Sequence, residues 1–493
     1  MNDRAVTGAA VDAQDRSVPP WFLTAHREPL RVQVRHSAGR SNWYYLGPAL
    51  MVFATFATFR HRGMEDLFES GTDMEIKLKL VIWALLGLIA LQRLPTILRN
   101  SSLLSTLPLA PYVAFCALAL GSTIYSVDPA LSGVRAGQIA VTIALGLSMV
   151  DRAPEWTRLG ALYLAINWAF LLIGLTGLIP ALDWRNLPGF QEAGYDGINS
   201  PWRFGTPIGH FSIISLVAAM LAVAHIARIQ REITLRDTAY LLWLLTTILL
   251  TVSRTGILGA VLGVAVVLVL RGGFALFALI TTAGTSALLL MPGEMDSIIQ
   301  FLDRGQDAQA LESLTGRTGI YDSALADISR SWVIGYGFRA SRAEHLNEIR
   351  DSLGNAYGIV AHAHNAVLES TVSLGVMGAL CAITILLSML LCALALMRRP
   401  RHSPPEWSGG RRAAAAPAAA QLTERSRAIE FCAYWPPIFV FSMMDSSFAL
   451  EINPFVFCFI AVMLDFTQHR SSVLRPDPET SAAASSDRGV RSG

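Results

Sequence analysis

About twelve apolar segments recur along the chain, and they restrict its fold more than any other feature. Each is close to the roughly 20 residues that a helix needs to cross the hydrocarbon core of a bilayer, although the seventh and eighth are short. Because lipid cannot hydrogen-bond to backbone N–H and C=O groups, we expect these segments to form helices, which satisfy those groups internally. The predicted spans are 43 to 59, 76 to 92, 107 to 125, 131 to 150, 158 to 180, 207 to 227, 238 to 252, 255 to 270, 273 to 291, 365 to 397, 429 to 447 and 452 to 467.

The composition agrees with this interpretation. Of 493 residues, 53% are hydrophobic and only 15% are charged, which would be an unusually apolar soluble protein. A net charge of +2 without a basic stripe gives no reason to expect nucleic-acid binding, and no Gly-rich motif ends in Lys-Ser or Lys-Thr. The sequence therefore predicts an all-α polytopic membrane protein with about 12 transmembrane helices. Its cysteines all lie inside apolar spans, so we expect no disulfide and no cysteine metal site: Cys116, Cys381, Cys392, Cys432 and Cys458.

Arginines near the ends of the spans predict the orientation, because positively charged loops stay in the cytoplasm. With the N-terminus inside, arginines occupy the inner loops along the whole chain, and the long polar segment before His364 lies outside. A loop of that length usually carries function. The expected organisation is a cytoplasmic tail without a signal core (1–42), transmembrane helices 1 to 9 (43–291), a large periplasmic loop containing short helices (292–364), transmembrane helices 10 to 12 (365–467) and a disordered cytoplasmic tail (468–493). A cytoplasmic linker (398–428), expected to be flexible over 400–420, interrupts the last group of helices.

This orientation gathers polar residues at the outer face. Arg135 lies one turn into the fourth span, Arg203 and His210 flank the start of the sixth, and Arg254 joins the seventh and eighth. Charged groups at a bilayer are costly and usually face a watery cavity lined by protein, so several at one depth indicate a site. The alternative is that each of them only anchors its helix at the membrane interface by snorkelling.

Arg254 is the strongest of these candidates. It lies in Ser253-Arg254-Thr255-Gly256, a junction with almost no loop through which an arginine could reach water. We expect it to bind an anionic substrate group. The alternative is that its guanidinium caps carbonyl groups at the end of the seventh span, which charge would also favour. A lysine would replace a carbonyl cap better than a bidentate phosphate clamp.

The long loop contains a predicted helix. Ile320, Ala324, Ile328 and Trp332 recur every fourth residue, as on one face of an amphipathic helix, and Thr318 is a plausible N-cap. Arg317 would then stand just before a helix N-terminus, whose free amides favour anions. The following turn, Gly335-Tyr336-Gly337-Phe338, offers an aromatic pair that could pack on a sugar ring or a lipid headgroup, or simply within the loop.

Two histidines end the loop, in Ala361-His362-Ala363-His364-Asn365. A helical zinc site would need ligands at i and i+4, but Leu368 occupies that position, so we expect no metal. Both histidines could be ordinary interfacial residues. With arginines on the same face, we expect His364 to act as a general base, since histidine suits proton transfer near neutral pH. Glu369 could orient it or be a buried carboxylate at the helix start.

These motifs together resemble the O-antigen ligase and Wzy-type polysaccharide polymerase family, with features of the exopolysaccharide polymerases. The resemblance covers roughly residues 120 to 395. Phe204 to His210 departs from the family pattern, which has a Gly-rich stretch containing an asparagine there, so no role is carried over to His210. The residues that carry the resemblance are Tyr125-Ser126-Val127-Asp128-Pro129, Ser253-Arg254-Thr255-Gly256, Thr315-Gly316-Arg317, Gly335-Tyr336-Gly337-Phe338, Ala363-His364-Asn365, Leu368-Glu369 and Leu374-Gly375-Val376-Met377-Gly378.

The resemblance implies a GT-C-like glycosyltransferase of the bacterial inner membrane that works on the periplasmic face without metal, nucleotide sugar or other cofactor. Its donor would be an oligosaccharide on undecaprenyl diphosphate. Arg254 and Arg317 would stabilise the leaving diphosphate, and His364 would deprotonate the acceptor hydroxyl, with inversion at the anomeric carbon. Residues expected to contact the substrate are Arg135, Arg203, Tyr336, His362 and Glu369.

The acceptor separates two versions of this function. A polymerase, which the loop motifs favour, uses another lipid-linked repeat unit and would work with a flippase and a chain-length regulator. A ligase uses the lipid A core. A transporter or flippase for lipid-linked glycan is a more remote alternative, because transporters place charges near the bilayer midplane and often contain internal repeats, and this chain shows neither.

Overall fold

The computed structural model describes residues 43–56, 74–107, 109–148, 156–177, 203–229, 233–273, 278–279, 282, 317–340, 363–398 and 411–444. Every element in this part of the chain is helical apart from an isolated bridge between Thr206 and Gly209. The longer helices are α1 (Trp43–Phe56), α3 (Met74–Gln92), α5 (Leu109–Gly121), α6 (Pro129–Leu147), α7 (Trp156–Thr176), α8 (Phe211–Arg228), α9 (Leu235–Leu250), α10 (Arg254–Leu270), α14 (Arg317–Arg330), α16 (Ala366–Arg398) and α17 (Arg411–Met444). Shorter ones are α4 (Leu94–Arg99), η2 (Ser101–Ser105) and η3 (Ser122–Ile124).

The helices follow the predicted spans closely. Each predicted span from 43–59 to 255–270, and those at 365–397 and 429–447, contains a helix. The span predicted at 452–467 and nearly all of that at 273–291 lie outside the described residues. Within the described residues, four helices are long and apolar enough to cross a membrane: Pro129–Leu147, Thr157–Thr176, Phe211–Arg228 and Ala366–Cys392. The expectation of an all-α membrane protein is therefore confirmed, whereas the number of twelve spans stays a prediction.

One expectation about the linker is wrong. We expected residues 400–420 to be flexible, but α17 begins at Arg411 and continues into the apolar segment. Alanine has the highest helix propensity of all residues, so the Ala-rich run after Arg412 extends the helix and does not interrupt it.

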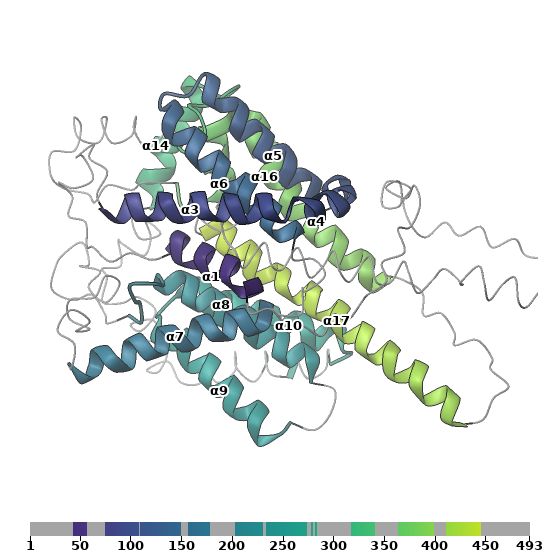
Figure 1. Cartoon of the computed structure of the whole chain (residues 1–493). Helices are drawn as coiled ribbons and strands as arrows, with labels where there is room; N and C mark the ends of the chain where they lie inside the picture. The colour runs from purple at the N-terminus through teal and green to yellow at the C-terminus, as the bar shows by residue number, and fades with distance from the viewer. Residues whose placement is uncertain are drawn as a thin grey trace, which may run out of the picture.

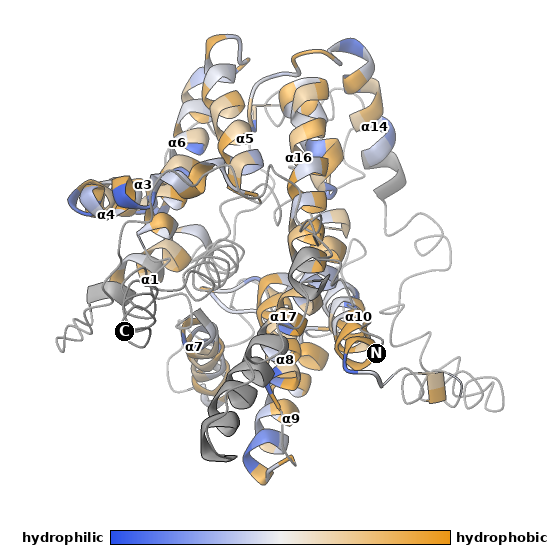
Figure 2. Ribbon diagram, turned by 90° about the vertical axis from the view of Figure 1, so that its right-hand side faces the viewer, coloured by the Kyte–Doolittle hydropathy of each residue, from blue (hydrophilic) through white to orange (hydrophobic). Residues whose placement is uncertain are grey.

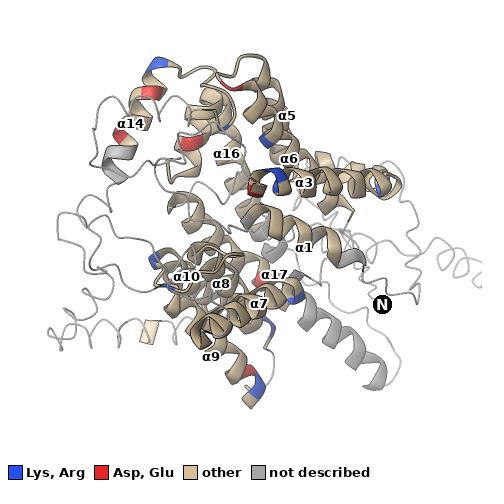
Figure 3. Ribbon diagram, turned by 60° about the vertical axis from the view of Figure 1, so that its left-hand side comes forward, with Lys and Arg blue, Asp and Glu red and all other residues tan. Residues whose placement is uncertain are grey.

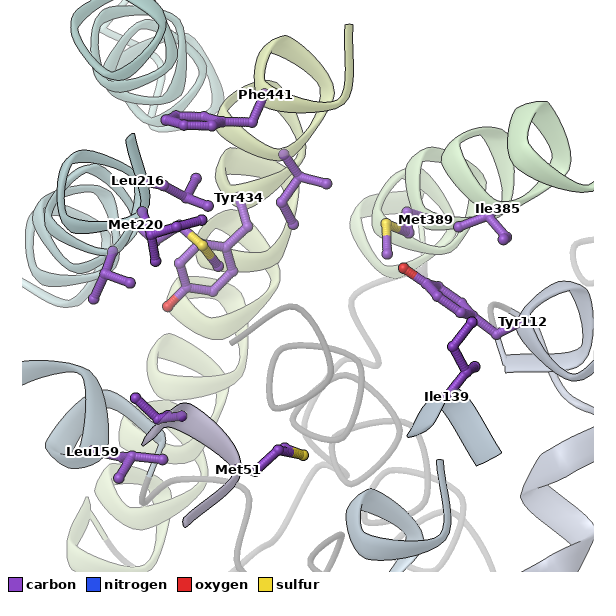
Figure 4. Packing of buried hydrophobic residues seen from close by; sticks show 14 of the residues in the cluster. Met51, Tyr112, Ile139, Leu159, Leu216, Met220, Ile385, Met389, Tyr434 and Phe441 are labelled. Carbon is purple, nitrogen blue, oxygen red and sulfur yellow. The ribbon is translucent and has the colours of Figure 1, made fainter. Parts of the chain in front are cut away.

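Two groups of helices build the molecule (Figures 1 and 2). In one, α10 packs against α8 and α17, and α8 also contacts α7 and α9. In the other, α5 packs against α6, and α6 against α3. α16 joins the groups because it contacts both α17 and α5. Figure 4 shows the buried side chains on both sides of this junction, among them Tyr434 and Phe441 of α17 and Met389 of α16.

An ion pair between the half-exposed Arg228 and the buried Glu430 ties α8 to α17. The Nε and Nη2 atoms of Arg228 donate to the two carboxylate oxygens of Glu430 at 2.7 and 2.6 Å, and the Tyr434 hydroxyl donates to Glu430 Oε1 at 2.5 Å. Glu430 is 2% exposed. A carboxylate so deeply buried is stable only when its oxygens are satisfied, as they are here. The contact fixes the end of α8 that lies away from Arg203.

The middle of α16 is broken at Gly375, where φ is 65° and ψ is −159°. Because the break interrupts the hydrogen bonds within the helix, carbonyl groups before Gly375 and an amide after it can bond to the segment that follows α14. Tyr336 N donates to Val372 O at 3.0 Å and Gly337 N to Ser373 O at 2.9 Å, while Val376 N donates to Trp332 O at 2.9 Å. The turn after α14 is thereby hydrogen-bonded into α16.

Gly375→Ala should destabilise this junction strongly. A Cβ atom there would overlap the carbonyl group of Val333, and alanine rarely adopts a φ of 65°. Strain of this kind costs on the order of 1–3 kcal/mol before any steric overlap is counted. We expect a lower melting temperature of the purified protein in detergent. Gly137→Ala is the matched control, because nothing lies within 4 Å of its Cβ position in α6; equal melting temperatures for the two variants would contradict this account.

Candidate functional site

Arg203 and Arg254 both lie near the C-terminal end of α9. Phe204 N donates to Leu250 O at 2.8 Å, which places Arg203 against the last turn of α9. Arg203 is 7% exposed, and its guanidinium lies over the Phe211 ring, 4.6 Å from the centroid. Such a cation–π contact holds a buried guanidinium in a fixed position. The turn that ends at Arg254 begins directly after Leu250.

The tight turn before α10 positions Arg254. Ser253 caps the helix by accepting a hydrogen bond from Gly256 N at 3.2 Å, which makes Arg254 the first helical residue. Gly256 fits so closely against Ser215 of α8 that a Cβ atom would overlap that serine. Arg254 is half-buried. Arg254 therefore stands at the positive end of the α10 dipole, where both the guanidinium charge and the free amides of the helix N-terminus favour an anion.

The segment before α8 is held by α7. The Thr206 hydroxyl donates to the side-chain oxygen of Asn167, and Gly209 packs so closely on Asn167 and Tyr163 that a Cβ atom would come within 2.5 Å of both. His210 ends the segment as the N-cap of α8, with its Nδ1 atom 2.6 Å from the Ser212 hydroxyl. Asn167 was missed in the sequence, although an asparagine inside an apolar span is itself a signal of a buried polar contact.

His364 lies at the start of α16 in an unusual backbone conformation. Its φ is 47°, in the left-handed region, and its side chain is half-buried. The next residue, Asn365, caps α16 by accepting hydrogen bonds from Val367 N and Leu368 N at 3.0 and 3.1 Å. A histidine with this φ is uncommon and needs support from its surroundings.

Glu369 supplies part of that support. Its Oε2 atom accepts a hydrogen bond from the backbone amide of Ala363 at 2.8 Å, and its Oε1 atom lies 3.5 Å from Nη1 of Arg339. Glu369 is 7% exposed. The carboxylate thus fixes the backbone of the residue before His364. Glu369 is also a buried carboxylate near the helix start, so both interpretations considered for it stay predictions. Arg339 was not identified in the sequence.

α17 brings His364 and Arg254 to the same end of the bundle. α10 and α17 run antiparallel, because the Cβ position of Gly263 lies 3.0 Å from Ala433 O and that of Gly259 lies 3.0 Å from Pro437 Cα. One further turn places the start of α10 beside the last turn of α17. There Met443 O accepts a hydrogen bond from Asn365 Nδ2 at 3.3 Å. The residue after His364 therefore contacts the same end of α17 that packs against the first turns of α10.

Residues with strained backbone conformations lie at or near Arg254, Glu369 and His364. Within the described ranges, the residues other than glycine with positive φ are Val252, Arg339 and His364. Val252 lies two residues before Arg254, Arg339 pairs with Glu369, and His364 is the predicted base. Strained conformations persist where the surrounding structure determines them fully, and they cluster at functional sites.

Arg135 and Tyr336 lie on the α6 side of this group. Ser132, one turn before Arg135 in α6, donates to Phe338 O at 2.7 Å, next to Arg339. Arg135 Nη1 donates to Gln138 Oε1 at 3.3 Å. Tyr336 is half-buried and packs in a small apolar cluster with Ala324, Ala363, Val372, Ile328 and Leu368. Phe338 is buried edge-on against Phe115, with ring centroids 5.6 Å apart, so this aromatic residue packs inside the protein.

The helix of the long loop is confirmed, with two corrections. α14 begins at Arg317, so Thr318 is not its N-cap, and it ends at Arg330, so Trp332 lies beyond it and is 60% exposed. The helix buries Ala324 and Asp327. The turn that follows it is hydrogen-bonded to α16, so Trp332 does not lie on the buried face of α14.

The side chain of Arg317 and all of His362 lie outside the described residues. In the described part of the chain no three His, Cys, Asp or Glu side chains gather as a metal site would require.

This arrangement defines a class: an all-helical membrane protein with arginines, a glutamate and a strained histidine at one end of its bundle. Residues 239–383, a segment that contains Arg254, Arg339, His364 and Glu369, match the family model described as O-antigen ligase. The predicted family resemblance is thereby confirmed. No curated protein matches the chain in a sequence search.

Glu369→Ala should slow the reaction without abolishing it. The substitution removes the acceptor for Ala363 N and the partner of Arg339, so the His364 backbone loses support. Misplacing a catalytic group by about 1 Å can cost on the order of 10²-fold in rate. Glu369→Gln keeps the hydrogen bond and loses only the charge, so we expect an intermediate kcat. Steady-state kinetics would check this, and a loss confined to KM would argue instead for direct substrate binding by Glu369.

Proposed function

We propose that this protein is a glycosyltransferase that transfers a glycan from undecaprenyl diphosphate to a sugar hydroxyl on the periplasmic side of the inner membrane. The observation that carries the proposal is the grouping of Arg254, Arg203 and His364 at one end of the bundle, within or beside the segment that matches the O-antigen ligase family. The N-terminal tail would be cytoplasmic, and residues 292–364 would cover the site from outside.

The arginines would act on the leaving group. Breaking the bond between sugar and diphosphate leaves negative charge on the phosphate oxygens, and preorganised cations aimed at that charge lower the barrier most. Arg254 at the N-terminus of α10 and the buried Arg203 would hold the diphosphate. Arg317, in the first turn of α14, would add a third cation, and Arg135 a contact to phosphate or acceptor.

His364 would act on the acceptor. The attacking hydroxyl must lose its proton as it bonds to the anomeric carbon from the face opposite the diphosphate, so the products are an inverted glycosidic bond and the free lipid diphosphate. A neutral imidazole at His364 would take that proton. Glu369 would keep the His364 backbone in place, and His362 and Tyr336 would line the acceptor side.

Two acceptors are possible, and different observations favour each. The loop motifs Thr315-Gly316-Arg317 and Gly335-Tyr336-Gly337-Phe338 resemble exopolysaccharide polymerases, which favours polymerisation of repeat units, with a flippase and a chain-length regulator as partners. The description of the matching family favours a ligase that transfers polymer to the lipid A core. We propose polymerisation as the principal activity.

The test uses purified protein in lipid nanodiscs with oligosaccharide linked to undecaprenyl diphosphate. Free lipid diphosphate together with a ladder of longer glycans would support polymerisation, and a glycan product that forms only when lipid A core is added would support ligation. Intact donor under both conditions would overturn the proposal. Movement of intact donor across a proteoliposome membrane would identify a flippase instead.

A further inference from the structure

A continuous apolar surface at the turn after α14 stands apart from the candidate site. Trp332, Val333 and Ile334 are 60%, 51% and 51% exposed, although they lie in a segment predicted as a periplasmic loop. Ile124 and Val127, in the connection between α5 and α6, are 90% and 49% exposed. Single exposed apolar residues need no explanation, but a contiguous patch of this kind marks an interaction surface.

Hydrogen bonds show that these residues are neighbours. The Tyr125 hydroxyl donates to Ile334 O at 2.8 Å, and Val127 N donates to Tyr336 O at 3.1 Å. On the other side, Val376 N donates to Trp332 O at 2.9 Å. The turn after α14 therefore lies between the α5–α6 connection and α16. We call the surface formed by Ile124, Tyr125, Val127, Trp332, Val333 and Ile334 the apolar rim.

The apolar rim continues the exposed apolar faces of two helices. On α16, Met377, Leu380 and Leu387 are 50%, 52% and 50% exposed, and Leu120 of α5 is 44% exposed. Figure 2 shows the apolar character of α16 along its length, and most of the helical ribbon in Figure 3 is uncharged. α16 contains a segment long and apolar enough to cross a membrane, and exposed apolar side chains along such a helix are those that face acyl chains.

In the apolar rim, Trp332 O accepts a hydrogen bond from Val376 N and Ile334 O accepts one from the Tyr125 hydroxyl. The backbone that directly follows the rim meets the condition for irregular structure inside a membrane. Non-helical backbone is tolerated at membrane depth only when protein satisfies its polar groups. From Gly335 to Phe338, every backbone N–H and C=O group has a hydrogen-bond partner within the protein. These partners come mainly from the broken α16 and from Ser122, Val127 and Ser132, and none needs water.

The length of α16 gives the depth. The part of α16 that follows the break at Gly375 is by itself long enough to span the roughly 20-residue hydrocarbon core, and it ends at Arg398, which is expected at the inner interface. Counting about 20 residues back from Arg398 places the outer edge of the hydrocarbon core near Gly378. Val376, which binds Trp332, lies at this edge. Trp332 and Tyr125 thus have the interfacial position that such aromatic residues prefer.

We propose that the apolar rim is embedded in the outer leaflet of the bilayer, so that the centre of the long outer loop re-enters the membrane and contacts lipid acyl chains. The contact holds α14, and with it Arg317, at the membrane edge. This inference does not depend on the reaction that the protein catalyses.

Spin-label accessibility in lipid nanodiscs tests the proposal. The full chain with its five cysteines replaced by alanine would carry a single nitroxide at Ile334→Cys, and Val333→Cys serves as a second position if the first variant folds poorly. Leu387→Cys, on the exposed face of α16, gives the lipid reference, and Asp322→Cys, on the exposed side of α14, gives the aqueous reference.

We expect the label at position 334 or 333 to relax more with oxygen than with a water-soluble nickel complex, which gives a depth parameter nearer to that of position 387 than to that of position 322. A depth parameter equal to that of position 322 would place the apolar rim in water and overturn the proposal. Low accessibility to both reagents would show that another part of the protein covers it, and would overturn the proposal equally.

Discussion

Replacing His364 should abolish glycan transfer while the protein still folds and inserts. Loss of a general base costs typically 10²- to 10⁴-fold in rate. His364→Asn is a sharper test than alanine, because asparagine tolerates the left-handed backbone at φ 47° but cannot serve as a base near neutral pH. We expect kcat to fall by about 10³-fold or more for both variants. Release of lipid diphosphate from a radiolabelled donor would measure it.

Two controls separate chemistry from folding. The level and melting temperature of His364→Asn in the membrane should match those of the unmodified protein. His210→Asn removes another histidine from the same end of the bundle while keeping a residue that caps α8 well, so its activity should be preserved. Full transfer by His364→Asn would exclude His364 as the base, and loss of both activities would indicate a shared structural role.

Most of the helical spans could be predicted because membrane-length apolar segments leave few alternatives. The errors have local causes. Residues 400–420 were predicted to be flexible because of their proline and glycine pairs and their Ala-rich run, yet α17 begins at Arg411, since an alanine-rich run is a strong helix former. The break at Gly375 could not be predicted, because only the turn after α14, far away in sequence, supplies partners for the opened backbone.

The site was predictable to the extent that topology determines it. Arg254 lies in a junction with almost no loop, and His364 lies where the long loop meets a span, so the sequence predicts both at the same face of the membrane. Arg254 and His364 come to the same end of the bundle because α17 packs antiparallel on α10, and no local pattern in the sequence predicts that packing. Arg339 was missed for the same reason: its partner Glu369 is thirty positions later and belongs to another helix.

Arg254→Lys should be nearly as damaging as loss of His364. Removal of one group that stabilises transition-state charge costs about 10²- to 10³-fold in kcat, and a lysine cannot reproduce the planar, bidentate geometry with which a guanidinium binds phosphate. The competing explanation is that Arg254 only caps backbone carbonyls, which a lysine would do almost as well.

Arg271 at the opposite end of α10 provides the matched control. Its Nη2 atom donates to the Ala227 carbonyl oxygen at 2.7 Å, so it is a carbonyl-capping arginine on the same helix, outside the candidate site. If phosphate binding is the role of Arg254, Arg271→Lys should retain activity while Arg254→Lys loses it at unchanged melting temperature. Equal and small losses for the two lysine variants would mean that Arg254 is a structural cap, and the diphosphate would then have to be held by Arg203 and Arg317 without it.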